Sequence, residues 1–128
     1  MNYTLTDTEE EFLKYLKKEL FLTRINIVPK VPLLQLTKQR SLSVPLTFKE
    51  EQLLSDVVID FVLYENDQPL AGIEIIDEPE ELTMSQGEKM LKETIFFRLG
   101  YHFFCFEELN DLKTAAHKVK TVVKEKQK

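Results

Sequence analysis

The segment Ser55–Asp77, SDVVIDFVLYENDQPLAGIEIID, sets the architecture of this chain. Its two arms, Val57–Tyr64 and Leu70–Ile76, are almost wholly apolar and are joined by ENDQP, whose residues favour turns. The segment therefore predicts a β-hairpin. Each arm carries one carboxylate near its middle, Asp60 in VVIDFVL and Glu74 in AGIEII. Ionised groups are rarely buried among apolar residues without a partner, so these two acids require an explanation.

Upstream of the hairpin the sequence predicts one helix and one strand. Apolar residues recur every four positions after a capping-box pattern, which predicts a helix over about Thr8–Leu20. The stretch LFLTRINIVPKVPLLQL predicts a strand. Pro29 and Pro32 predict that it either lies at the edge of a sheet or ends there, because proline lacks the amide that a central ladder needs. TKQRSLSVPLTFKEEQLL predicts a long connection with a short helical turn at Phe48–Leu54.

Downstream of the hairpin the sequence predicts a helix, a buried strand and a second helix. The first helix starts at about Ser85 and ends at Gly100 as a C-cap, and its apolar stripe comprises Met90, Leu91, Ile95, Phe96 and Leu99. YHFFCF is a short apolar strand, and the lysine-rich helix after it is expected to fray beyond about residue 122. The resulting α-β-β-β-α-β-α order predicts an α/β fold: a small mixed β-sheet flanked by helices on both faces, in a single domain over residues 1–128.

Composition narrows the functional classes. The chain has 128 residues, of which 43% are hydrophobic and 30% charged, as expected for one folded domain. A net charge of −5 gives no support to a surface that coats nucleic acid, although a local patch stays open. The single cysteine, Cys105, excludes an intrachain disulfide, and His102 and His117 have no second ligand at zinc spacing. With no membrane-spanning or signal-like segment, we expect no membrane partner and a cytoplasmic location.

Asp60 and Glu74 form a candidate metal site. In an antiparallel hairpin they can lie on the same face of neighbouring strands, where two carboxylates repel and lose hydration. They stay charged if a cation lies between them, and a hard divalent ion such as Mg²⁺ or Mn²⁺ suits an all-oxygen site. The alternative is purely structural, with Asp60 accepting backbone hydrogen bonds at a strand end and Glu74 at a partly exposed edge.

The stretches VPKVPL, VIDFVLYENDQPLAGIEIID and EKMLKETIFFRLGYHFFCF carry a family resemblance. An acid in one strand and an acid in the next, between an N-terminal helix and a later helix, resembles the PD-(D/E)XK nuclease-like superfamily, and most closely a small bacterial domain of that superfamily with a DFVL…IELDD…H pattern. The resemblance covers about Glu11–Leu112. It implies hydrolysis of phosphodiester bonds, with DNA as a partner, by divalent ions that activate water.

The resemblance also implies roles for individual residues. Asp60 and Glu74 would be the metal ligands, and Glu11 a further ligand from the first helix. The family lysine that follows the second acid by two positions is replaced by Ile76. Lys92 matches a helix lysine of the family, and Lys89 lies one turn before it, so either can lean over the site as a catalytic residue; the alternative is that both lie on the solvent-exposed face of the helix.

Further departures weaken the catalytic pattern. The family histidine is absent from DEPEELTMS, Lys89-Met90 replaces its RD pair, Phe106 replaces an arginine, and Asp77 is one residue too late to share the face of Glu74. The sequence therefore predicts a nuclease-like fold with lost or much reduced activity.

Three other interpretations remain open. A non-enzymatic protein-interaction module could use the same fold, as a homodimer or with another protein. A small molecule could bind beside Tyr64 and Glu74. The C-terminal lysines are expected to solubilise their helix, with phosphate contact as the alternative; they are Lys113, Lys118, Lys120, Lys124, Lys126 and Lys128.

Overall fold

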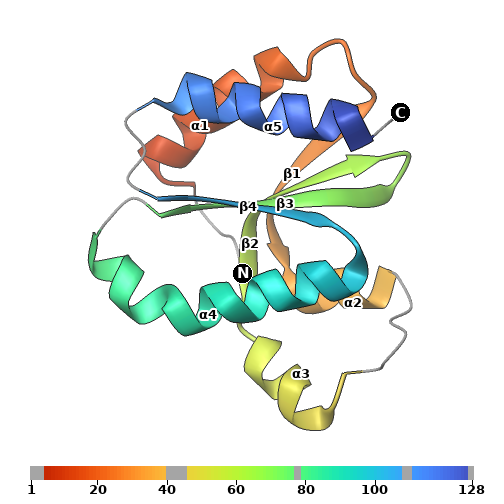
Figure 1. The fold of residues 1–128 in the computed structure, drawn as a ribbon, viewed down its shortest axis with the longest axis vertical. Helices are drawn as coiled ribbons and strands as arrows, with labels where there is room; N and C mark the ends of the chain where they lie inside the picture. The colour runs from red at the N-terminus through yellow and green to blue at the C-terminus, as the bar shows by residue number, and fades with distance from the viewer. Residues whose placement is uncertain (1–4, 40–45, 77–78, 108–110, 127–128) are drawn as a thin grey trace.

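The computed structural model describes residues 5–39, 46–76, 79–107 and 111–126 (Figure 1). The elements are α1 Asp7–Glu19, β1 Ile25–Pro32, α2 Leu33–Gln39, α3 Phe48–Leu54, β2 Val58–Glu65, β3 Gln68–Ile76, α4 Pro79–Leu99, β4 His102–Glu107 and α5 Leu112–Lys126. The predicted α/β fold is confirmed. The two short helices α2 and α3 fall in the connection between β1 and β2, and only α3 was predicted.

The four strands form one mixed sheet in the order β1-β2-β3-β4. β1, β2 and β3 are antiparallel neighbours, and β4 lies parallel to β3 after the α4 crossover. The predicted hairpin is β2–β3, and its turn residues Asn66 and Asp67 have φ of 51° and 65°, the left-handed values that two-residue hairpin loops require. The proline-containing strand β1 lies at the edge of the sheet, as predicted.

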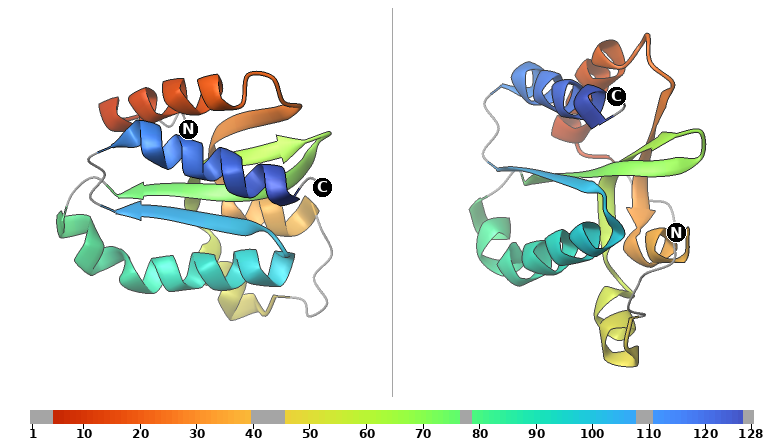
Figure 2. Two further views of the ribbon diagram at one scale, coloured as in Figure 1. Left: turned by 45° about the horizontal axis from the view of Figure 1, so that its top comes forward. Right: turned by 45° about the vertical axis from the view of Figure 1, so that its right-hand side comes forward.

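Helices cover both faces of the sheet (Figure 1). α1 and α5 lie side by side on one face, whereas α4 and α2 lie on the other and α3 projects beyond them (Figure 2). The first core, between the sheet and α1 and α5, contains Phe12, Leu16, Phe61, Leu63, Ile73, Ile75, Ala116 and Val119. The second core, on the α4 side, contains Leu33, Leu36, Leu54, Val62, Ile95, Phe96 and Leu99. The site described below lies at the sheet, between these two cores.

The helix α4 differs from its prediction in two respects. It begins at Pro79 rather than near Ser85, and its predicted buried stripe included Met90, which is 68% exposed. The buried position in that turn is taken by Lys92. The predicted C-cap is confirmed, because Gly100 has a φ of 79°.

Gly72 lets α4 approach β3 closely. A Cβ atom at this position would lie 2.4 Å from the ring of Phe96, which is closer than any real contact.

The last helix, α5, continues to Lys126, past residue 122 where fraying was expected. Within the described residues, no helix has the length and apolarity needed to cross a membrane.

Candidate functional site

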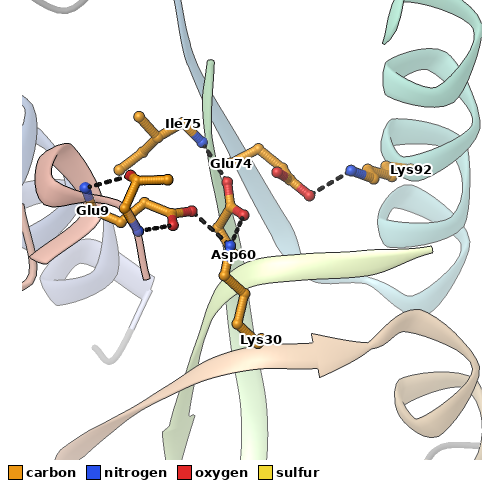
Figure 3. Close-up of polar contacts among 7 residues, drawn as sticks. Glu9, Lys30, Asp60, Glu74, Ile75 and Lys92 are labelled. Atoms are coloured by element: carbon orange, nitrogen blue, oxygen red, sulfur yellow. Dashed lines mark hydrogen bonds and ion pairs between the residues drawn. The ribbon is translucent and has the colours of Figure 1, made fainter. Parts of the chain in front are cut away.

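Five ionisable side chains from five different elements meet inside the fold (Figure 3). We call them the carboxyl–lysine cluster: Glu9 from α1, Lys30 from β1, Asp60 from β2, Glu74 from β3 and Lys92 from α4. All three acids are buried, with Glu9 4%, Asp60 9% and Glu74 8% exposed. Burying so many charged groups is favourable only if each has a partner, and each has one here.

Asp60 lies at the point where β2 separates from β3. The pairing of these strands runs from the turn to Phe61 opposite Ile73 and is not continued at Asp60. Beyond that point the Asp60 side chain replaces a backbone acceptor, since Asp60 Oδ2 accepts a hydrogen bond of 2.9 Å from the amide of Ile75. A buried amide that lost its ladder partner would otherwise be unsatisfied. The carboxylate therefore has a structural task in addition to any chemical one.

At the level of Asp60, the alternation of side chains between the two faces of the sheet is reversed in β1 and β2. Residues separated by an even number of positions should share one face of a strand. In β1, however, Ile25 packs in the first core and Val31 in the second, and in β2 the same holds for Phe61 and Ile59. The break in β1 falls at Lys30, whose φ of 53° is in the left-handed region that non-glycine residues seldom adopt.

Lys30 uses this backbone to reach two acids. Its Nζ lies 2.8 Å from Asp60 Oδ1 and 2.7 Å from Glu9 Oε2 (Figure 3). The other oxygen of Glu9 accepts a 2.8 Å hydrogen bond from the amide of Thr6, which completes the capping box at the start of α1. Glu9 is therefore both a helix cap and a counter-ion of Lys30.

Glu74 is paired from the opposite side of the sheet. Its Oε1 lies 2.5 Å from Lys92 Nζ. Lys92 occupies the same side of α4 as Ile95, Phe96 and Leu99, at helical spacings of three, four and seven residues, so its stem lies over the second core. The two lysines thus approach the acids from different layers of the fold.

The carboxyl groups of Asp60 and Glu74 also interact with each other. Burial and the hydrogen bond and charge of Asp60 raise the pKa of Glu74 to about 9, despite the opposing effect of Lys92. Burial alone would raise the pKa of Asp60, but hydrogen bonds with Glu74, the Ile75 amide and Lys30 lower it below its ordinary value. At neutral pH the proton is therefore held by Glu74, and Asp60 is the anion.

Burial and hydrogen bonds also determine the pKa values of Glu9 and Lys30. Burial raises the pKa of Glu9 and outweighs the hydrogen bonds from Lys30 and Thr6. Burial is the largest single influence on Lys30 and acts to lower its pKa, but the hydrogen bonds and charges of Asp60 and Glu9 together outweigh it and raise the pKa. Lys30 is therefore a firmly held ammonium.

The structure brings together three of the residues that the sequence singled out, Asp60, Glu74 and Lys92. It places Glu11 on the exposed face of α1, so the helical acid of the cluster is Glu9 instead. Lys89 is paired with Glu93 of its own helix at 3.9 Å and is one-third exposed.

Sequence reasoning missed Glu9 and Lys30. Glu9 had a usable signal, because it precedes Phe12 by three residues and so belongs to the buried stripe of α1. Lys30 had only a weak one, the two prolines around it, since its direction depends on a left-handed residue within a strand.

The described residues do not fit a divalent ion as they stand. Both oxygens of Asp60 and both of Glu9 are engaged by nitrogen donors, and Lys92 occupies Glu74 Oε1. Among the residues whose positions are described, no three His, Cys, Asp or Glu side chains are grouped so as to hold a metal. An ion at Asp60 would have to displace the Lys30 ammonium, and the two positive charges would repel in a poorly solvated site.

Comparisons with protein-family models, with curated proteins and with solved structures gave no match to this chain. The functional argument therefore depends on the site itself.

Proposed function

We propose that this chain is a PD-(D/E)XK nuclease-like domain that has lost phosphodiester hydrolysis and takes part in nucleic-acid processing without cutting. The observation that carries the proposal is the contact of Lys30 with Asp60, which together with the Ile75 amide engages both oxygens of that carboxylate. Hydrolysis by this class needs carboxylates that are free to hold Mg²⁺ or Mn²⁺ and activate a water. A cytoplasmic location accompanies this proposal.

The topology supports the nuclease-like part of the proposal. A helix, an antiparallel three-stranded unit, a crossover helix and a parallel fourth strand occur in the order that the resemblance implies. The two acids lie on the adjacent strands β2 and β3, and a buried lysine from α4 contacts the second of them. Lys92 thus supplies a positive charge beside Glu74. In the family this charge comes from a lysine that is replaced here by Ile76.

A cleavage assay tests the loss of activity. The wild-type chain and Glu74→Gln are incubated with supercoiled DNA, single-stranded DNA and RNA, in Mg²⁺ or Mn²⁺. We expect no cleavage by either protein above a no-protein blank. Cleavage by the wild type that Glu74→Gln abolishes would overturn the proposal. Fluorescence anisotropy with the same nucleic acids, in EDTA, tests the binding that the proposal requires.

A second candidate function is self-association through α4. Phe97 and Met90 are 85% and 68% exposed and lie seven residues apart, so they share one side of the helix. Large exposed apolar side chains that gather on one surface commonly mark protein contacts.

Sedimentation velocity distinguishes this second function. A concentration-dependent dimer that Phe97→Ser abolishes would favour it. Leu22→Ser is the matched control, because Leu22 is 92% exposed but lies in the turn between α1 and β1, outside α4. A monomer at all concentrations, together with binding to nucleic acid, would favour the first function.

A further inference from the structure

We infer that Lys30 is an internal cation that replaces a divalent ion in this site, and that its removal would expose a latent metal site formed by Glu9 and Asp60. The inference deepens the proposed function and rests on it, because it gives the physical reason why the acids of a nuclease-like fold do not serve hydrolysis.

With Glu74 holding a proton, the two remaining carboxylates of the cluster, Glu9 and Asp60, are balanced by the two lysines without an added ion. Lys30 and Lys92 together bring as much positive charge as one Mg²⁺ or Mn²⁺. The Lys30 side chain is only 18% exposed, and those of Glu9 and Asp60 are 5% and 12% exposed. Charges interact strongly in such a poorly solvated site, so an ammonium at 2.7 and 2.8 Å from two carboxylates satisfies them.

The backbone at Lys30 is strained. Its left-handed φ of 53° is unfavourable for a side chain with a Cβ atom, and it coincides with the change of sides in β1. Strain of this kind persists only where the surroundings over-determine the conformation. The two ion pairs of Lys30 are the compensating interactions on this side chain.

The arrangement opposes divalent ions. An ion that bound between Glu9 and Asp60 would have to separate Lys30 from both acids, although the Lys30 side chain is only 18% exposed. Without Lys30, Glu9 Oε2 and Asp60 Oδ1 would converge on the same space from α1 and β2. Carboxylate oxygens from different elements are the ligands that Mg²⁺ and Mn²⁺ prefer.

Direct Mn²⁺ binding tests this inference. The electron paramagnetic resonance signal of free Mn²⁺ is titrated with the wild type, with Lys30→Ala and with the control Lys14→Ala, whose lysine is exposed on α1. We expect Lys30→Ala to bind Mn²⁺ at least about tenfold more tightly than the wild type, and Lys14→Ala to match the wild type. Adding Glu9→Gln to Lys30→Ala should remove the gain.

A second variant guards against misfolding, and a measurement on the wild type tests the inference without any substitution. Asn accepts left-handed backbone better than Ala, so Lys30→Asn replaces Lys30→Ala if the latter does not fold. In the wild type, the amide resonance of Ile75 reports on Asp60 through their hydrogen bond. We expect Mn²⁺ to leave this resonance unbroadened.

The outcomes separate the inference from the proposed function. Broadening of Ile75 in the wild type, or equal Mn²⁺ affinity with and without Lys30, would overturn the role of Lys30. Neither result alone would overturn the loss of hydrolysis, which the cleavage assay decides. Cleavage of DNA by the wild type would overturn the proposed function even if Lys30→Ala bound Mn²⁺ more tightly.

Discussion

The two lysines of the cluster reach the acids by different routes. Lys92 extends from a regular helix, contacts the carboxyl group of Glu74 and covers apolar residues with its stem. Lys30 extends from a strand that must turn left-handed to direct it, and it contacts two carboxylates. Lys92 faces an acid that holds a proton at neutral pH, whereas Lys30 faces the ionised Asp60. Because Lys30 faces the ionised acid and Lys92 the protonated one, we expect Lys92 to be the more replaceable of the two.

Replacing Lys30 by methionine should have the largest effect. Lys30→Met keeps the length of the stem but leaves Asp60 and Glu9 without their ammonium, and breaking a buried ion pair in this way costs about 3–5 kcal/mol of unfolding free energy. Urea denaturation near neutral pH measures it. The exposed Lys14→Met should change stability by no more than about 0.5 kcal/mol. Equal effects of the two substitutions would contradict the importance assigned to Lys30.

The protonation of Glu74 predicts a dependence of stability on pH. Its folded pKa of about 9 lies above the unfolded value of 4.5, so between these values the folded state holds a proton that the unfolded state lacks. Raising the pH through this window therefore removes stability, by at most about 1.4 kcal/mol per pH unit from this one group. Glu74→Gln should lack this contribution. Denaturation of both proteins in EDTA, at several pH values, compares the slopes; parallel slopes would show that Glu74 is ionised.

Replacing Lys92 by methionine should be milder than replacing Lys30. Lys92→Met leaves a carboxyl group that can remain neutral, so we expect a loss of about 1–3 kcal/mol, the usual cost of an unsatisfied buried polar group. The same urea experiment measures it. If Lys92→Met destabilised the protein more than Lys30→Met, the ranking of the two lysines would have to be reversed.

The smallest predicted effect separates backbone strain from charge. Lys30→Asn and Lys30→Met both remove the ammonium, but Asn accepts a left-handed φ with less strain. We therefore expect Lys30→Asn to be about 1 kcal/mol more stable than Lys30→Met. Equal stabilities would mean that the left-handed conformation is lost together with the ion pairs. The amide chemical shifts of the residues next to Pro29 in β1 would reveal that loss.

Much of the fold could be predicted because its signals are local. Apolar runs flanking a turn sequence gave the hairpin, and apolar spacing gave α1 and the C-terminal part of α4. The helix α2 was missed because its residues directly follow Pro32 and continue the apolar pattern of the strand. In the site, Asp60 and Glu74 were found because charged residues contrast with apolar strands.

The remaining site residues were harder for a physical reason. Glu9 and Lys92 each occupy one position of a buried helical stripe, where a charged residue is easily assigned to solvent. Lys92 was singled out through the family resemblance and Glu9 was missed, although both share helical spacing with buried apolar residues. Lys30 could not be found in this way, because a single left-handed residue decides which acids it reaches, and that conformation depends on contacts distant in sequence.

The double role of Glu9 links two parts of the chain that are far apart in sequence. One oxygen fixes the first turn of α1, and the other holds the residue at which β1 changes sides. The same side chain therefore connects the start of α1 to the middle of β1. Loosening either contact should increase hydrogen exchange at both the start of α1 and the middle of β1, so that the two segments open as one cooperative unit.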